Sequence, residues 1–133
     1  MKHDGQQQDT IDLARTYLSL DGHGKVAVHP VDASFWQTIN SNRALLGSLV
    51  GIYASGADWP HWEMHPAGEE ILVLLEGALT LVLDSDGKET QVPLLPGEAV
   101  VVPRGTWHRA LVAVPSKLLG ITYGEGTQHR PLA

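Results

Sequence analysis

Cysteine is absent from all 133 residues of the chain, and this absence narrows the chemistry available to the protein. Without thiols there can be no disulfide, no thiolate nucleophile and no cysteine-bound zinc or iron–sulfur cluster. Any metal site must therefore be built from histidine, aspartate and glutamate side chains.

Basic residues are also scarce. Nine Lys and Arg stand against fifteen Asp and Glu, which gives a formal net charge of −6 at pH 7. This charge repels phosphate backbones, and no basic cluster in the sequence offsets it. We therefore expect no nucleic-acid partner.

Long apolar runs are missing as well. Runs such as Ile71 to Leu75 are far shorter than the roughly 20 residues that a membrane-spanning helix needs, so we expect no membrane partner. The polar start, Met1 to Asp9, lacks the apolar core of a secretory signal, which makes the cytoplasm the expected location. The length fits one domain with a single core, and we expect residues 1–133 to form that domain.

The first part of the chain has the spacing of a helix. Between Asp9 and Gly22 the apolar side chains recur at nearly helical intervals, with Asp9 or Thr10 as the cap and Gly22 and Gly24 as terminators. This pattern predicts one short helix, and a further helical turn is predicted over Ser34 to Ile39. We interpret residues 1–44 as an N-terminal extension.

From Leu45 the pattern changes to short runs rich in Val, Leu and Ile, separated every eight to twelve residues by Gly, Pro or Asp. Strands are predicted at 45–54, 59–65, 70–76, 78–84, 89–94, 99–103, 107–113 and 117–123. With no long helix between them, these strands cannot pair as a parallel α/β sheet, so an all-β sandwich or barrel is expected. Residues 45–123 would form its core and residues 124–133 a C-terminal tail.

Three metal-capable side chains share one face of the predicted strand 59–65. Because side chains alternate along a strand, His61, Glu63 and His65 point the same way. Glu70 follows after a turn, and His108 lies on a later strand. Two imidazoles with carboxylates suit Fe, Mn, Zn, Ni or Co better than Ca²⁺, which prefers oxygen ligands alone.

The spacing of these residues resembles the two motifs of the cupin superfamily. The first motif reads His-x-His, three or four residues, Glu, six residues, Gly; here Glu63-x-His65 is followed by Glu70 and Gly77 at matching intervals. Glu63 replaces the first histidine.

The second cupin motif reads Gly, five residues, Pro-x-Gly, two residues, His, three residues, Asn. Gly97, Pro103, Gly105 and His108 match it, and Val112 replaces the final Asn. The resemblance implies a small single-domain cupin, an all-β jelly-roll barrel that here carries a short N-terminal helical extension. It also implies a homodimer.

Carried over position by position, the resemblance implies one divalent metal ion held by Glu63, His65, Glu70 and His108. Glu69 is the alternative to Glu70, although only Glu70 keeps the interval to Gly77. His61 could replace Glu63 as a ligand, or it could contact a ligand from outside.

Several functions suit such a site. A two-histidine, one-carboxylate set leaves iron(II) with open positions for oxygen and substrate, which would allow dioxygenase chemistry. A Glu63 that does not bind the ion could instead act as the base of an isomerase. Both require a small organic substrate. The alternatives are a non-catalytic module that binds a small ligand or senses metal, and a metal-free structural protein.

Overall fold

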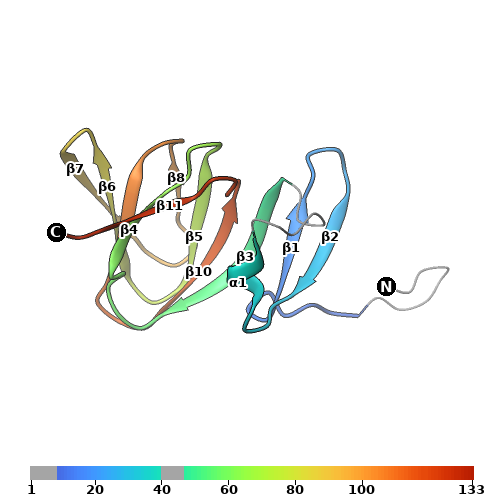
Figure 1. Ribbon diagram of the computed structural model, residues 1–133. Helices are drawn as coiled ribbons and strands as arrows, with labels where there is room; N and C mark the ends of the chain where they lie inside the picture. Colours follow the sequence, from blue (N-terminus) through green and yellow to red (C-terminus); the bar gives the residue numbers. More distant parts are fainter. Residues whose placement is uncertain (1–8, 40–46) are drawn as a thin grey trace.

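The computed structural model describes residues 9–39 and 47–133 (Figure 1). The predicted polar start up to residue 8, and the first two residues of the strand predicted at 45–54, lie outside these ranges. In chain order the elements are β1 (Thr16–Leu20), β2 (Val26–Pro30), α1 (Phe35–Thr38), β3 (Ser48–Ser55), β4 (His61–Met64), β5 (Glu70–Glu76), β6 (Leu79–Ser85), β7 (Lys88–Leu94), β8 (Ala99–Val102), β9 (Trp107–Val112), β10 (Ser116–Thr122) and β11 (Gln128–Pro131).

Two antiparallel sheets form the molecule, which confirms the predicted all-β barrel. One has the strand order β2-β1-β3-β10-β5-β8 and the other β11-β4-β9-β6-β7. Figure 1 shows β1, β2 and α1 to one side of the barrel, with β3 leading from them into it. The eight predicted strands correspond to β3 through β10, and the predicted turn at Ser34 to Ile39 contains α1.

The core lies between the sheets and follows the alternation of apolar residues. On β5 the buried apolar positions are Leu72 and Leu74, and on β6 they include Leu79 and Leu81. Leu118 of β10 is buried with them in one cluster. Each fully buried leucine side chain contributes about 2 kcal/mol by the removal of apolar surface from water.

The helix predicted between Asp9 and Gly22 is wrong, because this segment forms a turn followed by β1. The Asp12 carboxylate accepts a hydrogen bond from the Ala14 N–H (3.0 Å), and the Asp12 carbonyl accepts one from the Thr16 N–H (2.9 Å). An aspartate that bonds the backbone nearby favours turns over helix interiors. From Tyr17 to Ser19 burial then alternates with the period of a strand.

Gly22 and Gly24 therefore do not terminate a helix. They lie in the turn between β1 and β2 with φ angles of +84° and +92°, in the left-handed region that glycine adopts readily. The hairpin is joined to β3, since Leu18 pairs with Val28 on one side and Val50 on the other. Strands β1 and β2 thus extend a barrel sheet.

The C-terminal tail contains a strand that was not predicted. Strand β11 pairs antiparallel with β4, and His129 lies directly opposite Glu63. This pairing brings residues close to the end of the sequence onto the strand that carries the first motif. In the part of the chain that the structure describes, no helix is long and apolar enough to cross a membrane.

Candidate metal centre

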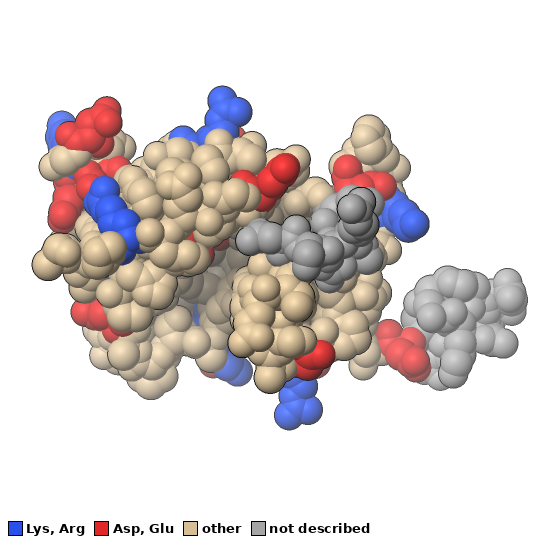
Figure 2. Space-filling model, viewed as in Figure 1, with Lys and Arg blue, Asp and Glu red and all other residues tan. Residues whose placement is uncertain are grey.

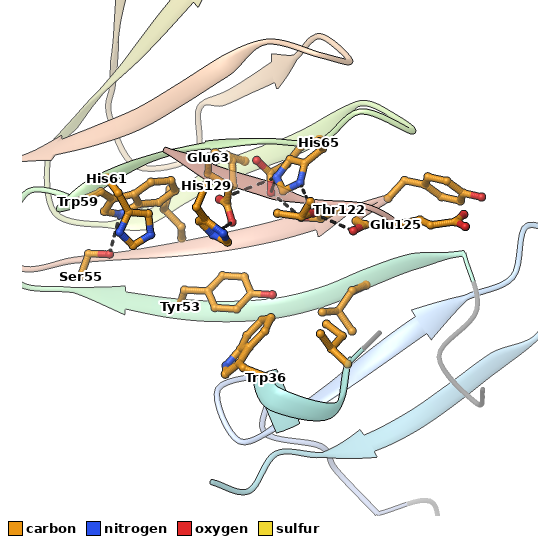
Figure 3. A pocket seen from close by; sticks show the side chains of 18 of the residues that line it. Trp36, Tyr53, Ser55, Trp59, His61, Glu63, His65, Thr122, Glu125 and His129 are labelled. Atoms are coloured by element: carbon orange, nitrogen blue, oxygen red, sulfur yellow. Dashed lines mark hydrogen bonds and ion pairs between the residues drawn. The ribbon is translucent and has the colours of Figure 1, made fainter. Parts of the chain in front are cut away.

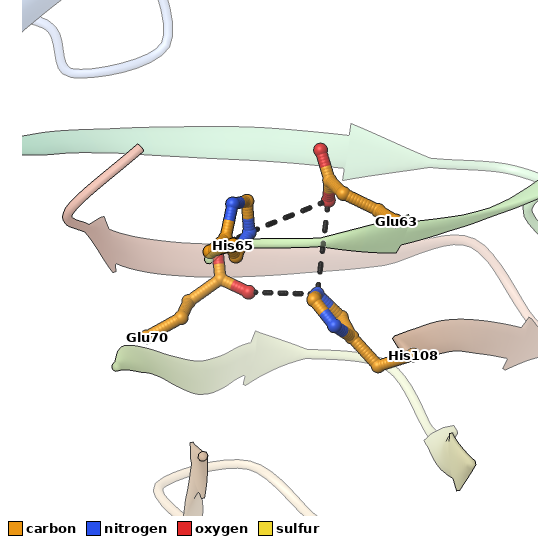
Figure 4. Close-up of side chains that lie close together, drawn as sticks. All are labelled: Glu63, His65, Glu70 and His108. Carbon is orange, nitrogen blue, oxygen red and sulfur yellow. Dashed lines mark ion pairs between the residues drawn. The ribbon is translucent and has the colours of Figure 1, made fainter. Parts of the chain in front are cut away.

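The four predicted ligands converge inside the barrel, although they come from distant parts of the sequence (Figure 4). Glu63 lies on β4, His65 directly follows that strand, Glu70 begins β5 and His108 lies on β9. Each offers one nitrogen or oxygen atom, and these four atoms lie within 4.8 Å of one another. Glu70 belongs to one sheet, while Glu63 and His108 belong to the other.

Strand pairing places these side chains. Glu63 and His108 are direct partners in the pairing of β4 with β9, and antiparallel partners present their side chains on the same face. The turn before His108 is also tied to the end of β4, because the Gly105 N–H donates a hydrogen bond to the His65 carbonyl (2.9 Å).

The distances in the cluster fit a single ion. Glu70 Oε1 lies 3.0 Å from His108 Nε2, and Glu70 Oε2 lies 3.3 Å from His65 Nε2. Glu63 Oε2 lies 3.8 Å from His65 Nε2 and 3.7 Å from His108 Nε2. Two donor atoms that each lie about 2.1 Å from one ion are at most about 4.2 Å apart. The four imidazole–carboxylate separations satisfy this limit, with Glu70 presenting a different oxygen to each imidazole. The four ligand atoms as a set lie within 4.8 Å of one another, so small side-chain shifts would close them around an ion.

Three atoms of the cluster are buried without a hydrogen-bond partner: His65 Nε2, Glu70 Oε1 and His108 Nε2. Although His108 Nε2 and Glu70 Oε1 are close, they lack the alignment of a hydrogen bond. Leaving a buried polar atom unpaired costs about 1–3 kcal/mol. Three such atoms facing one point indicate that something else satisfies them, and these residues could bind a metal.

Hydrogen bonds on the far side of each imidazole orient its free nitrogen. His108 Nδ1 lies 3.0 Å from the Thr106 carbonyl, which can only accept, so Nδ1 carries the proton. His65 Nδ1 lies 2.7 Å from Thr127 Oγ1, whose own proton goes to the Gly124 carbonyl (2.7 Å). His65 Nδ1 must therefore donate to Thr127. In the neutral form of each ring the lone pair therefore lies on Nε2, the nitrogen that faces the cluster.

Glu70 is held as a carboxylate. Burial alone would raise its pKa, but the adjacent imidazoles of His108 and His65 outweigh burial and hold the pKa at about 2. For His108, burial disfavours the charged form, yet the Glu70 carboxylate has the larger combined effect and raises the pKa. The Thr122 hydroxyl donates a hydrogen bond to Glu70 Oε2 and fixes its orientation.

The alternatives considered for the ligands lie outside the cluster. Glu69 is exposed, because its side chain points to the opposite face from Glu70. His61 is also exposed and packs edge-to-face on His129, with the ring centroids 4.9 Å apart. His129 Nε2 lies 3.4 Å from Glu63 Oε1. His129 and Thr127 were not predicted, since no motif marks them and only the fold brings them here.

A cavity of about 950 Å³ adjoins the cluster, and Glu63, His65 and Glu70 form part of its lining. Figure 2 shows a hollow between the barrel and the segment that carries α1. Within the cluster Glu63 is the side chain most open to this space, with 26% of it exposed against 4% for His65 and none for His108. A molecule in the cavity would meet Glu63 first.

Comparison with known proteins identifies relatives of this chain. A family model described as a cupin domain matches residues 49–119. The uncharacterized protein YdbB of Bacillus subtilis (strain 168) is 35% identical over 71 residues, which are 53% of this chain and 54% of that protein. The chain spans about half the length of the curated relatives that it matches.

Solved structures share the fold. A cupin-2 domain containing protein from Shewanella frigidimarina superimposes with a TM-score of 0.50 at 21% identity, covering 58% of this chain and 71% of that one. The iron(II) form of HppE in complex with substrate gives a TM-score of 0.51 at 18% identity, covering 58% of this chain and 43% of that one.

Proposed function

This chain belongs to the cupin-domain family, and from that premise we propose that it binds one divalent metal ion and acts on a small organic molecule in the adjoining cavity. Glu63, His65, Glu70 and His108 would be the ligands. The observation that carries the proposal is the convergence of three buried atoms without partners on one point.

The donor set defines the kind of ion. Two imidazole nitrogens and two carboxylate oxygens suit Fe, Mn, Zn, Ni or Co, and two carboxylates balance the charge of a divalent ion. When bound, the ion would polarise a substrate oxygen or, as iron(II), support oxidation by dioxygen. Iron(II) HppE, which shares the fold and was solved with substrate, is a precedent for an iron(II) ion and a substrate together in this fold.

The protein's own residues would do the rest. Thr127 and the Thr106 carbonyl hold His65 and His108 in the ring form whose lone pair lies on Nε2. Glu70 is ionised and anchored by Thr122. Glu63 borders the cavity, so it is the ligand placed to respond to a bound substrate, or to take a proton from it if it leaves the ion.

The experiment that tests metal binding is elemental analysis of protein purified without a histidine tag. We expect about one metal ion per chain in the wild type and a sharp loss in Glu70→Ala and in His108→Ala, because each removes a ligand from a small set. Glu69→Ala is the matched control, since its exposed carboxylate lies next to Glu70 but outside the cluster. Undiminished metal in both ligand variants would place the site elsewhere.

Turnover needs a second measurement. Oxygen consumption and isomerisation are followed for metal-loaded protein with a panel of small dicarbonyl and hydroxycarbonyl compounds. Consumption of oxygen would identify the dioxygenase form of the proposal, and conversion without oxygen the isomerase form. Metal and ligand binding without any conversion would instead identify a binding or sensory module.

A further inference from the structure

The cavity wall opposite the cluster is aromatic. Figure 3 shows Tyr53 and Trp36 on one side of the cavity and His129, Glu63 and His65 on the other. Trp36 lies on α1 and is 53% exposed, although it is one of the largest apolar side chains in the chain. Its ring lies 6.3 Å from that of Tyr53, measured between centroids. An exposed apolar ring in a cavity marks a surface that a ligand can cover.

The fold makes room for this aromatic wall. Gly120 lies beside the Tyr53 ring, and Gly51 lies beside the Tyr17 ring and the Tyr53 hydroxyl. A Cβ added at either glycine would come within 3.0 Å of these aromatic side chains. Tyr17 packs against both Tyr53 and Trp36, with centroid distances of 5.4 Å and 5.8 Å. The wall is therefore held in place before any ligand binds, which lowers the entropic cost of binding.

The cavity offers no cationic side chain to a ligand. Among the described residues that line it there is no Lys and no Arg, whereas Glu63, Glu70 and Glu125 are acidic. With two of these carboxylates balancing a divalent ion, an anionic ligand would gain little attraction there and would be repelled by Glu125. Burial raises the pKa of the Tyr53 phenol, so its hydroxyl is uncharged as well.

We propose that the ligand of this cavity is an uncharged molecule with a planar, aromatic part and one or two hydroxyl or carbonyl oxygens. The ring would lie against Trp36 and Tyr53, and the oxygens would face the cluster. A cavity of about 950 Å³ has room for such a molecule. This inference names the substrate class of the proposed function and so rests on it.

Three probes separate the contributions of ring and charge. Catechol is planar and uncharged, 3,4-dihydroxybenzoate adds a carboxylate to the same ring, and cis-cyclohexane-1,2-diol keeps the two hydroxyls without a flat ring. Calorimetric titration of Zn²⁺-loaded and of metal-free protein measures each affinity. We expect catechol to bind about fivefold more tightly than either comparison compound, since the diol loses the aromatic contact and the carboxylate is repelled by the acidic lining.

Variants at the wall test its role. Trp36→Ala should weaken catechol binding by about five- to tenfold and Trp36→Phe should restore most of it, because a flat ring is kept. Leu95→Ala, which changes an exposed apolar residue outside this cavity, should leave the affinity unchanged. Equal affinities for the three probes, or an unchanged affinity in Trp36→Ala, would overturn the inference. If the chain bound no metal but kept the catechol preference, only the metal proposal would fail.

Discussion

At the scale of single residues, the proposed metal centre depends on groups that never touch the ion. Thr127 has one proton and gives it to the Gly124 carbonyl, so the only interaction left for His65 Nδ1 is to donate to Thr127. This bond selects the ring form in which Nε2 carries the lone pair. A residue outside the ligand set therefore decides whether His65 can bind.

Thr127→Val keeps the shape of the side chain and removes the acceptor. We expect its affinity for Zn²⁺ to fall about 10- to 100-fold, the range for partners of metal-bound histidines. Thr127→Ser restores the hydroxyl and should restore the affinity. Competition with a chelator measures both variants. An affinity of Thr127→Val equal to that of the wild type would mean that the ring is oriented by other contacts.

Glu63 gives a second prediction at this scale, because it is where the chain departs from the family motif. If Glu63 binds the ion, Glu63→Gln should lower the affinity by at least about tenfold, while Glu63→His should keep the metal and raise the charge of the ligand set by one. If Glu63 is a free base, Glu63→Gln keeps the metal and loses only turnover. Elemental analysis alongside activity separates the two, and full occupancy in Glu63→Gln would refute direct ligation.

The residues of the cluster could be predicted from the sequence, whereas the residues around it could not. Glu63, His65, Glu70 and His108 have fixed motif intervals, and strand alternation points the side chains on β4 one way. Thr122, Thr127 and His129 approach the cluster only through tertiary structure: β10 pairs with β5, and β11 pairs with β4. No spacing within the sequence contains that information.

At the scale of elements, sequence reasoning succeeded where apolar runs are bounded by turns. Strands β3 to β10 have such bounds, and β5 (Glu70–Glu76) coincides with its predicted range. It failed for β1, where five apolar residues in the segment 11–18 have helical spacing by chance. The Asp12 turn and the alternating burial of Tyr17 and Ser19 outweigh this helical spacing. In the extended form the segment pairs with both β2 and β3.

The hairpin β1–β2 gives a prediction about pH. Buried His29 shares a hydrogen bond with the Ser19 hydroxyl (2.7 Å), and burial lowers its pKa below the ordinary value of 6.5. The unfolded chain then binds a proton more readily than the folded one, so the free energy of unfolding falls as pH drops below about 6.5. The slope from this one group is at most about 1.4 kcal/mol per pH unit.

His29→Gln keeps a hydrogen-bonding side chain and removes the titration. Between pH 7.5 and 5, urea unfolding should show a shallower loss of stability for this variant than for the wild type. His23→Gln is the matched control, because His23 is exposed in the turn of the same hairpin. Parallel pH curves for the wild type and His29→Gln would contradict a lowered His29 pKa.

At the scale of the whole molecule, the cluster joins the two sheets. Glu70 belongs to the sheet that also contains the hairpin β1–β2, while Glu63 and His108 belong to the opposing sheet with β11. Without an ion, the sheets meet here where the Glu70 carboxylate lies close to the imidazoles of His65 and His108. An ion bound by both sheets would tie them together, and such a set of ligands exists only in the folded chain.

Metal should therefore stabilise the folded protein by mass action. At a free Zn²⁺ concentration 100 times the dissociation constant, the gain is about 2.7 kcal/mol, which for a chain of this length corresponds to a rise in Tm of roughly 8–12 °C. Thermal unfolding followed by circular dichroism, across a series of Zn²⁺ concentrations, measures this shift. His108→Ala should lose it, because the variant lacks a ligand from the sheet opposite Glu70, whereas Glu69→Ala should keep it. A Tm that does not respond to metal in the wild type, or that rises equally in His108→Ala, would show that the cluster does not link the sheets through an ion.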